Sequence, residues 1–283
     1  MSEIKRVGVI GSGQMGGGIA QVAAVSGFET VVMDTSADQV ALCEKTHDKL
    51  LARAVEKGKM SEDDVKATKG RLTYVTDIKY LADSDIVVEA VVENAEVKKS
   101  IFKQLSGMLT GDQILASNTS SISITEIAAA TDCPERVIGM HFFYPVPVMK
   151  LVEVINGLAT DANVTERVIK LAGDMGKTAV PANDRAGFVS NRVLMPMINE
   201  AFYAWMEGVA EPEHLDQIMK LGCNHPMGPL ELADFIGLDT CAHIMNVLAD
   251  GLHSERYRPC PKLEQLVVAG RLGRKSGHGV FQY

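Results

Sequence analysis

Cysteine is scarce in this sequence, and its few occurrences are widely scattered. The five cysteines form no C-x-x-C pair and are odd in number; they are Cys43, Cys133, Cys223, Cys241 and Cys260. Neither a disulfide framework nor a zinc site is therefore predicted, and a reducing cytoplasm fits this pattern.

Long apolar runs and an excess of basic charge are also missing. The longest apolar stretches are far shorter than a membrane span, and the start "MSEIKRVGVIGSG" leads into a strand and a glycine turn without a secretory segment. The formal net charge of -8 disfavours nonspecific binding of nucleic acid. We therefore expect no membrane and no nucleic-acid partner, although a local basic cluster could still bind an anionic ligand.

What is present is typical of a folded two-domain protein. The chain has 283 residues, of which 46% are apolar and 23% charged. Strand and helix patterns alternate at first, with strands at "RLTYV", "DIVVEAV", "QILASNTS" and "RVIGMHFF", whereas the pattern after "TAVPANDRAG" is nearly all helical. We predict an α/β fold, with a doubly wound sheet in residues 1–184 and an all-helical domain in residues 185–283.

The stretch "RVGVIGSGQMGGGIAQVAAVSGFETVVMD" predicts a strand, a glycine turn, a helix and a second strand. Gly11 permits the tight turn, Gly13 lets the backbone approach a pyrophosphate, and Gly16 lets the helix pack on the strand. Gln14 and Met15 belong to the same turn. The second strand ends at Asp34, near the spacing expected for a carboxylate that contacts a ribose hydroxyl. An alternative is that Asp34 caps or turns the chain into the next helix.

Polar residues follow several predicted strands. In doubly wound sheets, ligands bind beyond the carboxyl ends of the strands, and the residues expected there are Glu93, Ser117, Asn118 and His141. Structural explanations remain for some of them, because Ser117 and Asn118 could cap a helix and Glu93 could begin one.

A basic stripe runs along the long helix predicted between Ser36 and Lys59. Lys49, Arg53 and Lys57 recur at four-residue spacing and share one face. The stripe is either a solvated face or a binding surface for phosphate groups.

The stretch "HFFYPVPVMKLVEVI" places His141 at a strand end and Glu153 in a following apolar strand. A histidine there is often a hydrogen-bonded core residue. The alternative is a pair in which the carboxylate holds one imidazole nitrogen and the other nitrogen accepts a proton, as a general base requires.

The helical half contains no pattern typical of a metal site. Its histidines lie too far apart in sequence for a local site, and we expect no bound metal. The methionine-rich stretch "LMPMINEAFYAWMEG" is typical of a helix-helix core or a subunit interface, so a homodimer is expected.

The sequence resembles the 3-hydroxyacyl-CoA dehydrogenase family nearly from end to end, in particular its short-chain bacterial 3-hydroxybutyryl-CoA members. The resemblance rests on "GSGQMGGGIAQ", "SNTSS", "HFFYPVPVMKLVEVI", "GFVSNRVLMPMINEA", "NHPMGPLELADFIGLD" and "LGRKSGHGVF". It implies a Rossmann domain, a helical dimerisation domain and a substrate cleft between them. It also implies a role in fatty acid and butanoate metabolism.

The resemblance also implies roles for individual residues. His141 and Glu153 would be a catalytic dyad, and Ser117 and Asn191 would contact the reacting part of the substrate. On the cofactor side, the implied residues are Asp34, Glu93, Lys98, Asn118 and Lys275. Lys49 and Arg53 would contact the coenzyme A moiety. The sequence departs from the family at Tyr144, where an asparagine is usual on the cofactor side; a phenol is larger and lacks the paired donor and acceptor of an amide.

The expected reaction is hydride transfer between NAD, or NADP, and a short-chain 3-hydroxyacyl-CoA. Two other functions remain open. One is a different two-domain β-hydroxyacid dehydrogenase, and the other is a non-catalytic NAD-binding relative. Intact Ser117, His141, Glu153 and Asn191 argue against the latter.

Overall fold

The computed structural model describes residues 3–109 and 111–283; residues 1, 2 and 110, which include the first residue of the predicted N-terminal domain, lie outside these ranges. The chain forms two compact units, and the division between them falls after Asp184. Each unit buries an apolar cluster of its own. This is the packing expected of two domains.

Unit 1, which ends at Asp184, is built on one sheet of eight strands within the described ranges. The strand order is β3-β2-β1-β4-β5-β6-β7-β8. The strands are β1 (Arg6–Ile10), β2 (Glu29–Met33), β3 (Leu72–Val75), β4 (Ile86–Glu89), β5 (Ile114–Ser117), β6 (Val137–Phe142), β7 (Leu151–Asn156) and β8 (Thr178–Asn183). Neighbours are parallel except β6 and β7, which are antiparallel. The first six strands have the order of a dinucleotide-binding sheet, with the switch point between β1 and β4.

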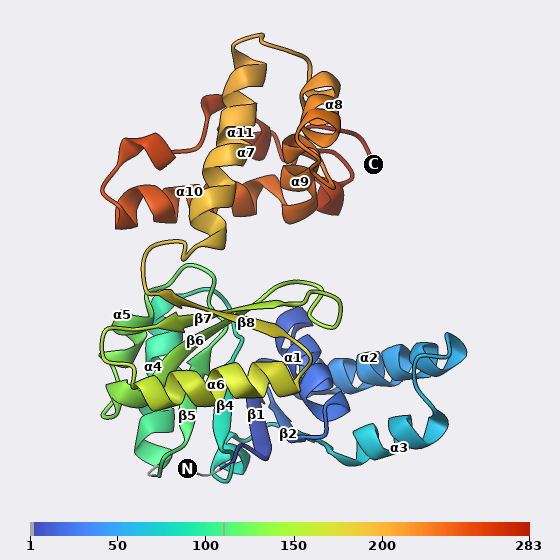
Figure 1. The fold of residues 1–283 in the computed structure, drawn as a ribbon, viewed down its shortest axis with the longest axis vertical. Helices are drawn as coiled ribbons and strands as arrows, with labels where there is room; N and C mark the ends of the chain where they lie inside the picture. The colour runs from blue at the N-terminus through green and yellow to red at the C-terminus, as the bar shows by residue number, and fades with distance from the viewer. Residues whose placement is uncertain (1–2, 110) are drawn as a thin grey trace. The chain divides into compact units, whose positions relative to one another are not determined.

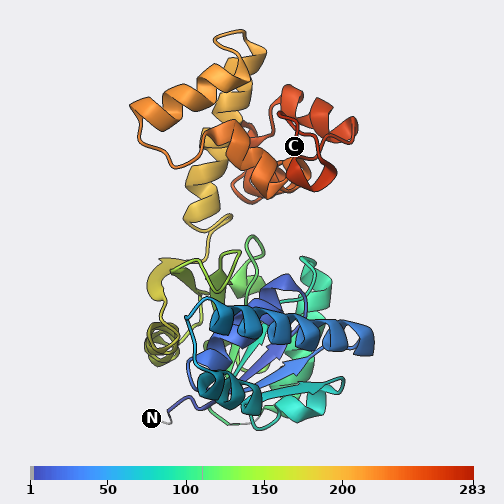
Figure 2. The same cartoon turned by 90° about the vertical axis from the view of Figure 1, so that its right-hand side faces the viewer.

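Helices cover both faces of this sheet, so the predicted doubly wound α/β fold is confirmed. α1 (Gln14–Val25) and α6 (Ala162–Asp174) share one apolar cluster with the strands. α4 (Ala95–Met108) and α5 (Ile124–Ala128) pack against each other and on the other face (Figure 2). α2 (Ala37–Glu56) and α3 (Glu62–Gly70) extend from the β2–β3 end (Figure 1). Short 3₁₀ turns lie at η1 (Ile78–Leu81) and η2 (Pro134–Arg136).

The strand β8 was not predicted, and Pro181 explains why. Proline lacks the N–H that a strand donates to its neighbour, so "TAVPAN" has the pattern of a linker. β8 tolerates Pro181 because it is an edge strand that pairs only with β7. The predicted change to helices still falls immediately after this strand.

Unit 2, from Arg185 to Tyr283, consists of helices, as predicted (Figure 2). They are α7 (Ser190–Met206), α8 (Pro212–Gly222), α9 (Pro229–Ile236), α10 (Leu238–Gly251), α11 (Pro261–Val268), η3 (Glu255–Tyr257) and η4 (Arg274–Ser276). Proline occupies the first turn of α8, α9 and α11, where a missing N–H costs no helical hydrogen bond. Within the described ranges, no single helix is long and apolar enough to cross a membrane; α9 and α10 meet the criteria only as a pair bent by 97°.

Candidate active site

The glycine turn between β1 and α1 is built so tightly that two of its positions exclude a side chain. Gly11 has a φ of +94°, and a Cβ atom there would lie 2.5 Å from the carbonyl oxygen of Ala90. A Cβ at Gly16 would lie 1.8 Å from the carbonyl oxygen of Gly11. Both glycines are therefore required by the fold itself.

Gly13 differs from these two glycines, because a Cβ there would meet no atom within 4 Å. The packing of the protein does not demand a glycine at this position, so its lack of a side chain leaves open space beside the turn. Gly13 is also the N-cap of α1, which has no side-chain cap and no acidic residue in its first turn. An uncapped helix N-terminus with free space in front fits a pyrophosphate group.

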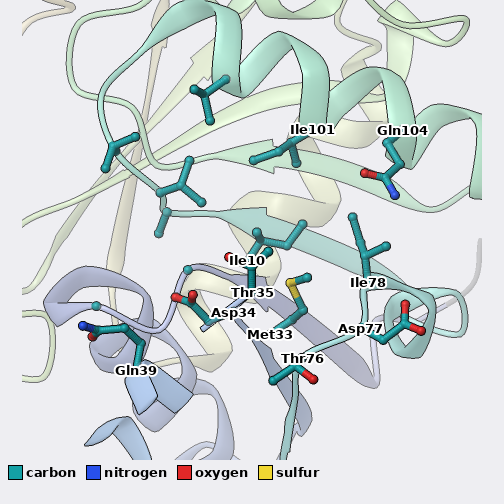
Figure 3. Close-up of a pocket in the computed structure, with 16 residues that line it drawn as sticks. Ile10, Met33, Asp34, Thr35, Gln39, Thr76, Asp77, Ile78, Ile101 and Gln104 are labelled. Carbon is teal, nitrogen blue, oxygen red and sulfur yellow. The ribbon is translucent and has the colours of Figure 1, made fainter. Parts of the chain in front are cut away.

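A pocket of about 950 Å³ lies next to this turn, at the carboxyl ends of β1, β2 and β4 (Figure 3). Apolar side chains from several elements line it, among them Ile10, Met33, Ile78 and Ile101. Its size and apolar walls suit an adenosine group, the part of a dinucleotide that binds on this side of the switch point.

Asp34 borders the pocket and is held by the glycine turn. Its Oδ2 accepts hydrogen bonds from the Ser12 backbone N–H at 2.9 Å and from the Ser12 hydroxyl at 3.0 Å. Its Oδ1 accepts from the Ser36 N–H at 3.1 Å. The helix cap of α2 is Ser36 rather than Asp34, because the Ser36 hydroxyl accepts from the Gln39 N–H. A carboxylate has about four acceptor sites, so Asp34 retains capacity for a ribose hydroxyl.

On the other side of the switch point lies a buried polar network that includes a residue not predicted from the sequence, Glu89. Its Oε1 accepts from the Lys98 ammonium and from the Val91 N–H, both at 2.7 Å, and its Oε2 accepts from the Ser117 hydroxyl at 2.7 Å. The exposed fractions are 0% for Glu89 and 1% for Lys98. A glutamate at the end of the apolar run "DIVVE" was the only sequence signal that could have indicated it.

Glu93 joins this network from the loop before α4. Its Oε2 lies 3.3 Å from the Lys98 Nζ, and its Oε1 accepts from the Thr119 hydroxyl at 2.6 Å and from the Ser121 hydroxyl at 2.9 Å. Burial raises the pKa of Glu93, but the charge of Lys98 and these hydrogen bonds outweigh it, so the pKa is lowered overall. Glu93 is therefore an anion that ties two loops together.

The side chain of Ser117 is completely buried in this structure, and its hydroxyl donates to Oε2 of Glu89. Ser120, three residues later in "SNTSS", is only partly buried. Asn118 is also partly buried, and its Oδ1 accepts from the Phe142 N–H at 2.9 Å, which joins the end of β5 to the end of β6.

His141 and Glu153 form the predicted pair. They face each other directly in the antiparallel register of β6 and β7, and the Nδ1 of His141 lies 2.7 Å from Oε2 of Glu153. Both are buried, with exposed fractions of 7% and 4%. When Nδ1–H donates to the carboxylate, the neutral imidazole has its acceptor on Nε2. The ring also packs against Phe143, with centroids 4.5 Å apart.

The loop between β6 and β7 is fixed by a lysine that the sequence did not single out. Lys177 is buried, and its Nζ donates to the carbonyl oxygens of Val146 at 2.5 Å and Met149 at 2.8 Å. The Val146 side chain packs on α1, where a Cβ at Gly18 would lie 2.9 Å from it. Tyr144, the second residue of this loop, precedes Pro145 with a cis bond and is 53% exposed.

The remaining predicted residues lie apart from this network. Lys49 and Arg53 are exposed on α2, and neither side chain has an ion-pair partner among the described residues. In unit 2, Asn191 is a buried residue in the first turn of α7. Lys275 forms an ion pair with Asp239 at 2.5 Å. In the described part of the chain, no group of three or more histidine, cysteine or acidic residues could hold a metal ion.

A sheet of this order, with an uncapped helix N-terminus at its switch point, defines a dinucleotide-binding protein. Residues 6–185 match the model of the 3-hydroxyacyl-CoA dehydrogenase NAD binding domain, and residues 187–283 match that of the 3-hydroxyacyl-CoA dehydrogenase C-terminal domain. The chain belongs to the 3-hydroxyacyl-CoA dehydrogenase family.

Individual relatives are similar along their whole lengths. The chain is 56% identical to a probable 3-hydroxybutyryl-CoA dehydrogenase of Bacillus subtilis (strain 168), over 99% of this chain and 98% of that protein. It is 51% identical to a 3-hydroxybutyryl-CoA dehydrogenase of Bradyrhizobium diazoefficiens, over 99% of this chain and 96% of that protein. The crystal structure of (S)-3-hydroxybutyryl-CoA dehydrogenase from Ralstonia eutropha superposes with a TM-score of 0.97 at 47% identity, covering 99% of both chains.

Proposed function

We propose that the chain catalyses reversible hydride transfer between NAD(H) and a short-chain 3-hydroxyacyl-CoA/3-oxoacyl-CoA pair, with 3-hydroxybutyryl-CoA and acetoacetyl-CoA as the expected pair. The observation that carries this proposal is the 2.7 Å contact between His141 and Glu153 in a member of this family. The names of its relatives in Bacillus and Bradyrhizobium support the same substrate.

The proposed chemistry assigns the proton to His141. Oxidation of the 3-hydroxyl group requires removal of its proton, and the imidazole Nε2 accepts it while Glu153 orients the ring and stabilises the imidazolium. Bound NAD supplies the hydride acceptor. Ser120, which is less buried than Ser117, is the serine that we assign to the 3-oxygen, and Ser117 contributes through its hydrogen bond to Glu89. Asn191 is assigned as a contact to the thioester end of the substrate.

The proposed cofactor site follows the geometry of the turn. Gly11, Gly13, Gln14, Met15 and Gly16 would hold the pyrophosphate at the start of α1. Asp34 would accept a ribose hydroxyl. Because a carboxylate repels a 2'-phosphate, we propose NAD rather than NADP.

Residues further along the chain complete the proposed cofactor side. The residues that we assign to the nicotinamide half are Glu93, Lys98, Asn118, Tyr144 and Lys275. Lys49 and Arg53, exposed on α2, would bind the phosphates of the acyl-CoA. A cytoplasmic homodimer is part of the same proposal, supported by the scattered cysteines and the methionine-rich helix α7.

The test is reduction of acetoacetyl-CoA, followed by loss of reduced-cofactor absorbance, with NADH and NADPH measured side by side. We expect turnover with a higher kcat/KM for NADH. A higher value for NADPH would contradict the role of Asp34. No turnover with either cofactor would favour a non-catalytic NAD-binding protein, and turnover of a free 3-hydroxy acid alone would favour a different β-hydroxyacid dehydrogenase.

A further inference from the structure

Glu89 occupies the strand position at which the two halves of the dinucleotide site meet. It ends β4, where it is paired in register with Ile10 of β1 on one side and with Ser117 of β5 on the other. The residue that follows Ile10 is the first glycine of the turn. Glu89 therefore lies at the switch point, directly beneath the crevice that receives a dinucleotide.

Every partner of the Glu89 carboxylate is a hydrogen-bond donor. Oε1 faces the Lys98 ammonium and the Val91 N–H, and Oε2 faces the Ser117 hydroxyl. Because the Glu89 side chain is fully buried, its charge is little screened by solvent.

The network of Glu89, Glu93 and Lys98 does not balance its charges. Lys98 is a single ammonium that bridges both carboxylates, at 2.7 Å from Glu89 and 3.3 Å from Glu93. Two anions and one cation leave one net negative charge. Glu89 and Lys98 are buried, whereas the Glu93 side chain is 30% exposed, so the excess negative charge lies at the solvent-facing edge of the network.

A dinucleotide provides a reason for this excess charge. The adenosine-sized pocket lies at the carboxyl ends of β1, β2 and β4, and the network runs from β4 to β5, the side left for the nicotinamide half. The oxidised nicotinamide ring is a cation and the reduced ring is neutral. A fixed negative charge in unit 1 therefore attracts one redox form and not the other.

We infer that this network, through the charge of its buried member Glu89, makes the site favour NAD⁺ relative to NADH. The inference rests on the proposed function, because it assumes that NAD(H) occupies the crevice. It makes Glu89 a positioning residue with an electrostatic effect: it touches neither the substrate nor the reacting atoms. The measured quantity is the ratio of the dissociation constants, Kd for NAD⁺ divided by Kd for NADH.

The first variant is Glu89→Gln, which keeps the size of the side chain, an oxygen for Lys98 and Val91, and a donor for Ser117. Calorimetric titration of the full-length protein with each redox form should show the ratio rising about ten-fold. This is the usual effect of a unit charge several ångströms away at an effective dielectric constant of about 20. Glu96→Gln is the control, because Glu96 lies on α4 two residues before Lys98 but its side chain is 82% exposed. Its ratio should not change.

Two further variants test the charge count itself. Lys98→Met leaves two carboxylates and should lower the ratio, whereas the double variant Glu89→Gln/Lys98→Met leaves one and should return the ratio close to that of the wild type. A role of Glu89 in holding loops together does not predict this restoration. Thermal melting verifies that each variant folds, and Lys98→Met tests the same count if Glu89→Gln does not fold.

The outcomes separate this inference from the function on which it rests. If the wild type binds neither NAD⁺ nor NADH, both are wrong. If it binds and turns over both forms, but Glu89→Gln or Lys98→Met shifts the two dissociation constants equally, the inference alone is wrong.

Discussion

At the scale of the residue, the pairing of His141 with Glu153 is set by strand register. The two residues are opposite each other in an antiparallel pair, so their side chains leave the same face of the sheet. A shift of one residue in this register would send one of them to the other face. The short connection between β6 and β7, held by Lys177, keeps that register fixed.

The pair should act as a unit in catalysis. We expect His141→Gln to lower kcat by about 100-fold or more, the usual effect of removing a general base, with NADH affinity close to normal. Glu153→Gln keeps the shape but removes the charge that stabilises the imidazolium, so kcat should fall as well. The double variant should resemble His141→Gln alone, because neither residue functions without the other.

Steady-state kinetics and NADH titration of the three variants check this prediction. A merely structural histidine would give a different pattern: melting temperature and NADH affinity would fall together, without a selective loss of kcat. Additive losses in the double variant would argue that the two residues act independently.

At the scale of the element, the glycine turn separates residues needed for folding from those needed for binding. Gly16→Ala places a methyl group against the backbone oxygen of Gly11, so we expect a loss of about 3 kcal/mol or more in the free energy of unfolding. Gly13→Ala meets no protein atom and has an extended backbone, so its stability should change by less than about 1 kcal/mol.

Gly13→Ala should affect cofactor binding rather than stability. It should weaken NADH binding by about ten-fold or more, because the methyl group occupies the space left for the pyrophosphate. Urea denaturation and NADH titration measure the two effects. Tight NADH binding by a folded Gly13→Ala protein would show that the pyrophosphate does not approach this position.

The packing of α1 on α2 contains a buried histidine that should make stability depend on pH. His47 on α2 lies 2.8 Å from the Gly17 carbonyl oxygen through Nε2 and 2.6 Å from the Tyr74 hydroxyl through Nδ1. Burial lowers its pKa below the ordinary value of 6.5. As the pH falls through about 6.5, the unfolded chain binds this proton before the folded protein does, so this contribution to stability is present above 6.5 and is lost below it.

The measurement is urea unfolding between about pH 7.5 and 5.5, comparing wild type with His47→Gln. The wild type should lose stability faster on acidification, with a difference in slope of at most about 1.4 kcal/mol per pH unit, the limit for one proton. Parallel curves would mean that His47 titrates alike in both states.

Much of unit 1 could be predicted because its signals are local. The strands β1 to β6 are short apolar runs, and the turn glycines stand at fixed spacing. Burial of a polar side chain is not local, so the sequence alone does not show that Ser117 faces Glu89 inside the fold. Glu89 was missed for the same reason: its partners Lys98 and Ser117 lie on other elements, and only the folded sheet brings them together.

At the scale of the whole molecule, thiol reactivity should distinguish one cysteine from the other four. All five thiols are free; Cys223 is exposed and the others are buried. Burial raises the pKa of Cys43 to about 11 and that of Cys241 to about 12, which suppresses their thiolate forms. Mass spectrometry after brief treatment with iodoacetamide should therefore show one adduct in the native protein and five in denaturant. More than one native adduct would indicate that a buried thiol opens to solvent.

The single tryptophan gives the molecule a second built-in reporter. Trp205 lies on α7, beside Phe202 and under the ammonium of Lys262, so its emission follows the packing of the helical unit. The dinucleotide turn and the pair of His141 and Glu153 belong to the other unit. A dye on Cys223 and the native indole would thus both observe unit 2, whereas the absorbance of bound NADH would observe unit 1, and each half could be followed optically without adding or removing a single residue.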